Sequence, residues 1–339
     1  MLKRKLCQVD ITWELTCDGP LLIRDERFTE FKKNELKIIK KEGDVFPDCI
    51  FLSRSTKADF DKAARESKNK RPELPFFVPG TSVRGPFRAQ AERIIRSLLP
   101  ENAQDGLTAC DPFLQEKQAD RTLLSCSKRL AKAGKEKSIY GQACPACKLF
   151  GCAGLGSRIT FTDADIEHHV SVFRDMIGID RFTGGVYSPE KGGGANMRFH
   201  VLENTKFTTK ISVANFEMWQ IGLLAYVFRD FAEQAVPIGY GKTKGFGLVK
   251  GEVKDIILTY PKATTQIEHL ASLMKDENGY YGIMHCEAPE FDHVEDLPQG
   301  MSFYFQKKIT DIPSFMQTVA PFFNCFIDEL NKRAGEGIQ

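Results

Sequence analysis

Apolar and polar residues alternate in two stretches of the chain, as they do in a β-strand with one buried face. Residues 8–17 alternate without a break, with Trp13 in the middle of the apolar set, and residues 206–213 follow the same pattern. Shorter strands are expected at residues 158–163 and 246–257, where β-branched and aromatic residues gather. The pattern therefore predicts four strands.

Two other segments repeat apolar residues with helical spacing. The first starts at Thr81 or Ser82, either of which can cap a helix, and Pro100 stops it. Its apolar stripe consists of Phe87, Ala91, Ile94, Ile95 and Leu98. The second follows the cap candidate Asn215. The resulting order is strand, helix, strand, strand, helix, strand, which is the βαββαβ pattern of an α+β, ferredoxin-like (RRM-like) fold.

Long insertions interrupt this pattern. Residues 1–258 are expected to form the core, and residues 259–339 a C-terminal extension that packs on it. Residues 28–75 are charged and lysine-rich and predict a long loop, whereas residues 101–156 form a cysteine-containing insertion. In residues 178–200, glycine clusters flank few hydrophobic residues, which predicts a projecting hairpin.

Composition adds limits on function. The chain of 339 residues is 42% hydrophobic and 27% charged, with a formal net charge of +2, as expected of a globular protein. A charge this close to zero means that nucleic-acid binding would depend on a local basic surface. The sequence has neither an apolar run that could span a membrane nor a signal peptide after its basic N-terminus. A cytoplasmic protein without membrane contact is therefore expected.

Five of the ten cysteines lie in or near the insertion at residues 101–156. Cys144 and Cys147 have the CxxC spacing that lets two thiolates reach one metal ion, and Cys110 and Cys126 would complete a four-cysteine zinc site. A redox pair is the competing interpretation, although no βαβ pattern surrounds the CxxC, and free structural thiols are the third. Cys152 is left out because it precedes a glycine-rich turn.

Residues 237–251 contain five glycines and three lysines outside any familiar phosphate loop. A Walker A loop requires glycine where Val236 stands, and a dinucleotide fingerprint requires glycine where Lys244 stands. The segment is either a tight connection between helix and strand with solvated lysines, or an anion-binding loop. Glycine lets a ligand approach the backbone, and lysine supplies positive charge for phosphate.

Four motifs in a fixed order resemble the repeat-associated mysterious proteins (RAMPs) of CRISPR systems. Val78–Gly85 is similar to that family's PGSSLKG-type entry to the first helix, and Cys144–Gly151 to the CPxCxLFG zinc knuckle of the backbone subunits of type III effectors. Ile179–Gly185 resembles the IDRxTG segment that opens the family's thumb hairpin, and Gly239–Gly247 its glycine-rich loop. The Csm/Cmr-like, Cas-seven-type backbone subunits are the nearest in kind, and a III-D/III-E-like effector is the expected subtype.

The resemblance implies an RRM-like fold that assembles with other RAMP-type and type III effector subunits along a CRISPR RNA guide, with complementary target RNA as the second nucleic acid. Such proteins grip the guide by phosphate and sugar rather than by its bases. The residues expected to contact RNA are Ser82, Arg84, Arg158, Arg181, Gly239, Gly241, Lys242, Lys244 and Gly245.

The resemblance also implies cleavage of target RNA as a candidate activity. Members that cut use an aspartate in the loop between the first strand and first helix, where a carboxylate can hold Mg²⁺ or orient the ribose 2′-hydroxyl. Asp48 corresponds best to that position, Asp44 is second and Asp25 third. A non-catalytic structural or capping subunit is the alternative. A ribonuclease that processes precursor CRISPR RNA is another, and it would depend on histidines such as His168, His169 and His200.

Overall fold

The structure is a computed structural model. The described residues are 3–27, 47–55, 75–100, 103, 106–114, 124–132, 134, 137–187, 196–276, 278–284, 290–299 and 303–336. Most of the predicted loop at residues 28–75, including the candidate Asp44, lies outside them.

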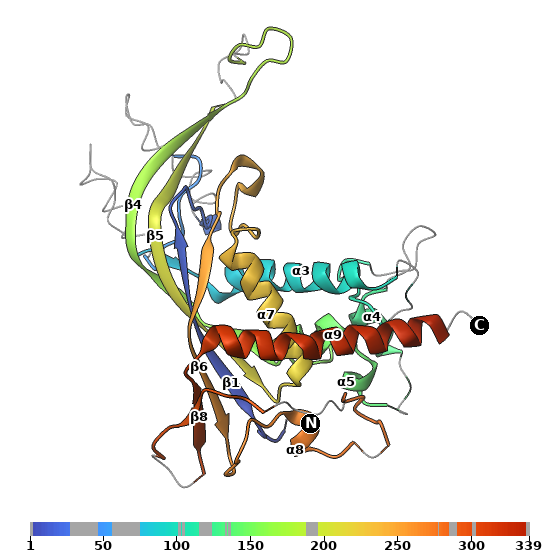
Figure 1. Cartoon of the computed structure of the whole chain (residues 1–339). Helices are drawn as coiled ribbons and strands as arrows, with labels where there is room; N and C mark the ends of the chain where they lie inside the picture. The colour runs from blue at the N-terminus through green and yellow to red at the C-terminus, as the bar shows by residue number, and fades with distance from the viewer. Residues whose placement is uncertain are drawn as a thin grey trace.

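One antiparallel sheet organises the described part of the chain (Figure 1). Its strands are β1 (Gln8–Cys17), β2 (Phe77–Val78), β3 (Ile159–Phe161), β4 (Ala164–Ile177), β5 (Asn196–Ala214), β6 (Lys250–Tyr260), β7 (Val294–Asp296) and β8 (Phe305–Ile309). The strand order is β2-β4-β5-β1-β6-β8-β7, and β3 also pairs with β5. This mixed arrangement with an antiparallel sheet is consistent with the expected ferredoxin-like fold.

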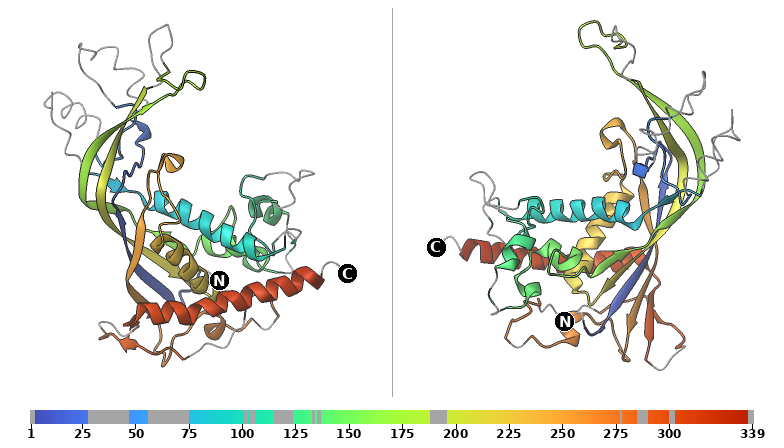
Figure 2. Two further views of the ribbon diagram at one scale, coloured as in Figure 1. Left: turned by 45° about the horizontal axis from the view of Figure 1, so that its top comes forward. Right: turned by 180° about the vertical axis from the view of Figure 1, so that it is seen from behind.

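The main helices lie on one face of the sheet, as the three ribbon views agree (Figures 1 and 2). The helices are α3 (Gly80–Leu98), α4 (Cys126–Ala131), α5 (Ile139–Gln142), α6 (Pro145–Phe150), α7 (Met218–Ala232), α8 (Leu270–Leu273) and α9 (Ile312–Glu336), with a short 3-10 helix η1 (Lys242–Lys244). Helices α3 and α7 supply the apolar surface that covers the sheet, and α9 packs on α7. None of the helices in the described ranges is long and apolar enough to cross a membrane.

Trp13 of β1 lies at the centre of the core. Its ring makes edge contacts with Phe87 of α3 and with Phe228 and Phe231 of α7, at centroid distances of 5.5, 5.4 and 4.9 Å. Gly251 on the neighbouring strand β6 leaves space for this ring, because a Cβ there would approach Trp13 Cζ2 to 2.6 Å. Aromatic edge contacts and burial thus join the sheet to both helices.

The opposite face of β1 is polar and is held by ion pairs. Glu14 contacts Lys206 of β5 at 2.6 Å and Lys254 of β6 at 3.3 Å, and the hydrogen bond from Lys206 lowers the pKa of Glu14. Asp10 contacts Lys210 at 3.5 Å. The strict alternation predicted for residues 8–17 is therefore confirmed, since every second residue is buried.

Strands β4 and β5 form a hairpin that extends far beyond the rest of the sheet (Figures 1 and 2). Their pairing runs from Ile166 opposite Phe207 to Ile177 opposite Asn196, with register shifts near His168. The hairpin was expected at residues 178–200, so its arms begin earlier in the chain than predicted. Apolar residues occur along these arms, and Phe199, Val201 and Leu202 of β5 are buried, whereas most of β4 is exposed or half-buried.

Both predicted helix caps are wrong. Helix α3 begins at Gly80 after Pro79, with no side-chain cap bond; instead the Gly80 amide donates to Asp163 Oδ1 at 2.9 Å. In α7 the cap is Glu217, which forms a capping box with Gln220. Asn215 has a positive φ of 50°, and its side chain accepts a hydrogen bond from the Leu6 amide at 2.8 Å. Tertiary contacts decided which polar residue met each helix end.

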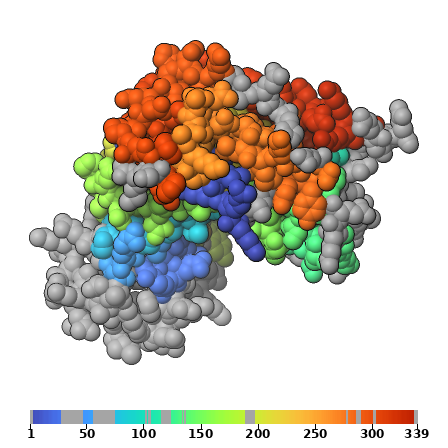
Figure 3. Space-filling view, turned by 90° about the horizontal axis from the view of Figure 1, so that it is seen from below, coloured from blue at the N-terminus to red at the C-terminus, as the bar shows by residue number. Residues whose placement is uncertain are grey.

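The C-terminal residues extend the same sheet. They supply the strands β7 and β8 and the long helix α9. Strand β8 pairs with β6, and β7 pairs with β8 at the edge. From below, the N-terminal residues lie among the C-terminal segments (Figure 3). Trp219 of α7 stacks on Phe326 of α9, with ring centroids 3.9 Å apart.

Candidate functional site

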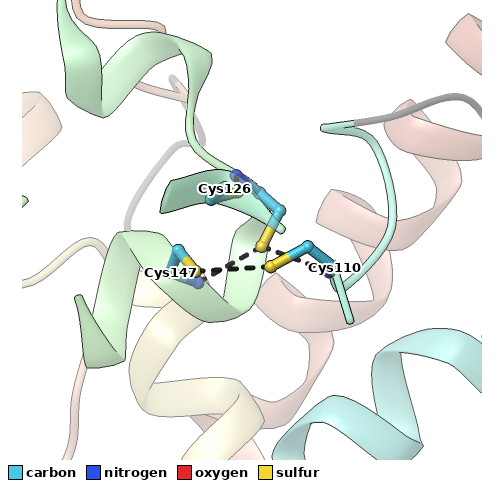
Figure 4. Close-up of side chains that lie close together, drawn as sticks. Cys110, Cys126 and Cys147 are labelled. Carbon is cyan, nitrogen blue, oxygen red and sulfur yellow. Dashed lines mark hydrogen bonds between the residues drawn. The ribbon is translucent and has the colours of Figure 1, made fainter. Parts of the chain in front are cut away.

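Four cysteines from separate segments converge beside α3. Cys110 lies in the loop before α4, Cys126 begins α4, Cys144 precedes α6 and Cys147 lies within it. Their sulfur atoms all lie within 4.8 Å of one another, and all four residues are buried (Figure 4 shows three of them). This is the set expected from the sequence, and Cys152 stays outside it. The cluster could hold a metal ion such as zinc.

The cluster fits a tetrahedral ion in size and in chemistry. The sulfur atoms of Cys110 and Cys147 are 3.7 Å apart, and Zn–S bonds of about 2.3 Å place neighbouring sulfurs about 3.8 Å apart. The amides of Cys110 and Cys147 donate to Cys144 Sγ at 3.5 and 3.4 Å, and the Cys144 amide donates to Cys126 Sγ at 3.4 Å. Hydrogen bonds among the four thiols lower the pKa of Cys126 and raise the pKa of Cys144 and Cys147.

Arginines of α3 hold the cysteine-containing insertion. Arg84 Nη2 donates to Phe150 O at 2.5 Å, and Arg96 donates to the carbonyl oxygens of Ala109 and Cys110 at 3.0 and 2.6 Å. Burial lowers the pKa of Arg84, and the nearby charge of Arg88 adds to that effect. The guanidinium predicted to contact RNA at Arg84 is thus bound to a protein carbonyl.

Arg158 is also used inside the protein. Its residue is 3% exposed, Nη1 donates to Asn215 O at 2.6 Å, and the guanidinium lies 3.7 Å from the ring centroid of Tyr140. The expected contact of Arg158 with RNA is therefore corrected to a structural role. Ser82 is half-buried in the first turn of α3, where its amide donates to Pro79 O at 2.9 Å.

The glycine-rich loop is a closed turn held by its own backbone. Gly239, Gly241, Gly245 and Gly247 all have positive φ, between 74° and 79°. A Cβ at Gly239 would lie 2.4 Å from Leu22 O, and one at Gly247 would lie 1.9 Å from Ile238 O. These two glycines are required by close backbone approach.

Several backbone amides of this loop donate hydrogen bonds to carbonyl oxygens of the protein. Those of Lys244 and Phe246 donate to Gly241 O at 2.8 and 3.2 Å, and that of Gly247 donates to Pro20 O at 2.8 Å. The amide of Tyr240 donates to Leu22 O at 2.7 Å. Any anion that binds here would therefore meet side chains more than amide groups.

Both lysines of η1 are exposed. Partial burial and the nearby positive charge of Arg93 lower the pKa of Lys242. Lys244 Nζ lies 5.3 Å from the ring centroid of Phe199 on β5. The loop thus presents two cations next to the β4–β5 hairpin.

Asp48 lies against β5 of the same hairpin. Its amide donates to Arg198 O at 2.6 Å, and its Oδ2 accepts from the Arg198 amide at 2.8 Å. The next residue, Cys49, pairs with Phe199, the residue that also contacts Lys244. The structure therefore brings the first-choice aspartate and the glycine-rich loop to the same short segment of β5.

The segment around Asp48, which belongs to the predicted loop at residues 28–75, packs against the core. Pro47 and Cys49 are buried, and Phe51 packs against Phe76 at a centroid distance of 5.6 Å. Asp48 itself is half-buried. Main-chain pairing with β5, which sequence periodicity does not report, orders these residues.

Asp25 is buried and forms hydrogen bonds within the protein. It is 1% exposed, and its carboxylate accepts from Arg27 Nη2 at 2.7 Å and from Arg27 Nε at 3.0 Å. Arg27 Nη2 also donates to Ser53 O at 2.7 Å. Asp25 thus holds two segments together. Asp44 lies outside the described residues.

Arg181 is exposed at the tip of the hairpin, where Asp180 Oδ1 accepts from the amides of Phe182 and Thr183 at 2.7 and 3.2 Å. This turn also leaves the ring of Phe182 fully exposed. Among the described residues of the tip, Arg181 and Phe182 are exposed to a partner.

Sequence reasoning missed two residues that shape this region. Arg198 forms an ion pair with Asp175 across the hairpin at 2.7 Å, and its backbone amide and carbonyl groups form hydrogen bonds with Asp48. His200 is buried, and its Nδ1 accepts from the Phe51 amide at 3.4 Å. Only the pairing of residues 48–51 with β5 reveals either role. His200 is in the core, whereas His168 and His169 of β4 are exposed, so the histidine-dependent ribonuclease stays an open alternative.

Comparison with known proteins gives one match. A family model described as the RAMP superfamily matches residues 14–250, which is 237 of the 339 residues. The matched range includes the end of β1, all of α3, the four cysteines and the loop Gly239–Gly247. No curated protein matches the chain.

Proposed function

The chain belongs to the RAMP superfamily, and from this we propose that it is a backbone subunit of a type III CRISPR effector that holds guide RNA by its phosphates. Membership of the superfamily supports a CRISPR-associated RNA-binding role. We further propose that β1, α3, the β3–β4 segment, β5, α7 and β6 are the βαββαβ core, since β6, β1, β5 and β4 are adjacent in that order.

The observation that carries the proposal is the glycine-rich loop. It fixes exposed Lys242 and Lys244 on a rigid turn beside the hairpin, and Arg93 of α3 lies close enough to perturb Lys242. Within the described ranges neither lysine forms an ion pair with a carboxylate, and adjacent cations of this kind are suited to a phosphate backbone. The open face of β1 carries Asp10 and Glu14 in ion pairs, so it offers no aromatic platform for base stacking.

Cleavage of target RNA is the finer part of the proposal, with Asp48 as the acting carboxylate. One of its oxygens accepts from the Arg198 amide, which fixes its orientation against the hairpin. A carboxylate at this position can hold Mg²⁺ or orient a ribose 2′-hydroxyl. A non-cutting structural subunit remains the second candidate function, and it is favoured by the half-buried, hydrogen-bonded state of Asp48.

We propose zinc as the occupant of the cysteine cluster, held by Cys110, Cys126, Cys144 and Cys147. Its role would be structural, because four protein ligands leave no open position for a substrate. The metal would hold the insertion together next to α3.

The experiment is guide-RNA binding measured by fluorescence anisotropy at several salt concentrations. Replacing Lys242 and Lys244 with alanine should flatten the slope of log K against log salt by about one unit per lost phosphate contact. The loss should be the same for unrelated guide sequences. The matched control replaces the exposed Lys128 of α4 and Lys332 of α9, which removes the same charge elsewhere. An unchanged slope in the loop variant, or an equal change in the control, contradicts the proposal.

A further inference from the structure

Two arginines point their guanidinium groups at the sulfur atoms of the cysteine cluster. Arg88 Nη2 of α3 donates to Cys147 Sγ at 3.6 Å, and Arg129 Nη2 of α4 donates to Cys126 Sγ at 3.4 Å. The two contacts reach different sulfurs from different helices. They were not expected from the sequence.

Each arginine is also fixed by a second contact in the insertion. Arg88 Nη1 donates to Gly151 O at 3.1 Å, and Arg129 Nη2 donates to Gln142 O at 2.5 Å. Both carbonyl groups belong to the segment that carries the CxxC pair. The fold therefore holds the guanidinium groups in position independently of their contacts with sulfur.

The charges around the cluster are the second observation. Four thiolates around a divalent zinc ion carry two net negative charges. Near the cluster, Arg88 and Arg96 share the carboxylate of Glu92 at 2.7 and 3.3 Å, and Arg129 forms no ion pair with a carboxylate in the described part of the chain. Three arginines and one glutamate carry two net positive charges. The protein supplies the opposite charge that a buried tetrathiolate zinc site requires, because an uncompensated buried charge is costly.

We propose that Arg88 and Arg129 are outer-shell residues of the metal site, which donate hydrogen bonds to the ligand sulfurs and neutralise the charge of the zinc-thiolate centre. The inference rests on the zinc site proposed above. It gives α3 a second role, because the helix packs Phe87 into the core on one side and directs the next residue, Arg88, at the metal site on another.

Metal retention tests this proposal without RNA. The full-length chain, purified with zinc, is mixed with excess chromogenic chelator, and the rate of zinc release is followed for Arg88→Gln and Arg129→Gln. Loss of an outer-shell contact should accelerate release about tenfold or more. Arg88→Lys, which keeps the charge, should lie between Arg88→Gln and wild type. The matched control is Arg84→Gln, because Arg84 also donates to a carbonyl of the insertion but makes no hydrogen bond to a cysteine sulfur of the described residues.

Substituting cobalt for zinc adds a spectroscopic measurement that a general loosening of the insertion would not change. Removing a hydrogen bond to a ligand sulfur should shift the sulfur-to-cobalt charge-transfer band to longer wavelength in Arg88→Gln and Arg129→Gln, and leave it in place in Arg84→Gln. If Arg88→Gln does not fold, the band of Arg129→Gln decides.

Two results overturn the proposal: release at the wild-type rate in both glutamine variants, or equal acceleration in the Arg84→Gln control. A wild-type chain that contains no zinc would instead refute the metal site itself. If the wild-type chain does not bind guide RNA while zinc release follows the expected pattern, that result counts against the RNA-binding proposal alone.

Discussion

Alanine at Gly247 is expected to destabilise the protein far more than alanine at Gly245, although the two glycines lie two residues apart with nearly equal φ values of 74° and 79°. A Cβ at Gly247 would lie 1.9 Å from Ile238 O, whereas a Cβ at Gly245 would meet no atom within 4 Å. Comparing the two variants therefore separates two costs of replacing glycine by alanine. One is the left-handed backbone conformation, and the other is contact of the new Cβ with a nearby backbone atom.

The magnitudes follow from the contacts. The left-handed conformation costs about 1 kcal/mol for alanine at either position. At Gly247 the backbone must also move, which strains the hydrogen bonds from the Ile238 amide to Gly247 O (2.9 Å) and from the Gly247 amide to Pro20 O (2.8 Å). Each is worth about 1 kcal/mol. Gly247→Ala should thus cost about 3 kcal/mol, and Gly245→Ala about 1 kcal/mol.

Equilibrium unfolding in urea measures both variants, with tryptophan fluorescence as the signal, since both tryptophans, Trp13 and Trp219, are buried. The entropy that alanine removes from the unfolded chain is common to the two variants, so it cancels in their difference. The expected difference is about 2 kcal/mol. Equal losses in the two variants would refute the claim that close backbone approach, rather than φ alone, requires glycine at this end of the loop.

Further outcomes are expected at the cysteine cluster, at two aspartates and in the core. Cys147→Ser should lower zinc from about one ion per chain to near none in elemental analysis, while Cys152→Ser should keep it; equal retention by both would argue against a four-cysteine site. In a reconstituted effector with Mg²⁺, Asp48→Ala should abolish cutting of labelled target RNA yet keep guide binding, and full cutting would make the chain a scaffold. Asp25→Ala should instead lower the free energy of unfolding by about 1–3 kcal/mol, because it removes buried hydrogen-bond acceptors, and unchanged stability would contradict that structural role. Trp13→Ala should cost about 3–5 kcal/mol in urea unfolding; a loss under about 1 kcal/mol would mean that this ring is not central to the core.

The strands and helices of the core were the part of the fold that the sequence predicted well. In residues 8–17 each apolar residue faces the helices, because a side-chain period of two assigns every residue to one face. The stripe on α3 was less accurate: Phe87, Ala91 and Ile95 are buried, but Leu98 is 48% exposed. Periodicity gives the direction of a side chain but not whether a neighbour covers it.

Within the candidate site, the sequence predicted the types of functional residue better than it predicted their bonding partners. Thiol spacing within the CxxC pair is local, so Cys144 and Cys147 could be identified from the sequence, whereas only the structure shows that Cys110 and Cys126, rather than Cys152, lie beside them. Arg84 and Arg158 were chosen as cations for RNA, yet their guanidinium groups bind the carbonyl oxygens of Phe150 and Asn215. A positive charge in a sequence does not show whether its partner is solvent, phosphate or the protein itself.

The sequence by itself determined the segments that can bury an apolar face, the cysteines that can share an ion and the glycines that permit a tight loop, because these depend on side-chain type and short spacing. Only the tertiary structure decided that Asp48 lies beside the glycine-rich loop, through pairing of residues 48–49 with residues 198–199 of β5. It also decided that Arg88 and Arg129 meet the cysteine sulfurs. Contacts between residues separated by tens or hundreds of positions depend on how sheet and helices pack, and no local pattern in the chain records them.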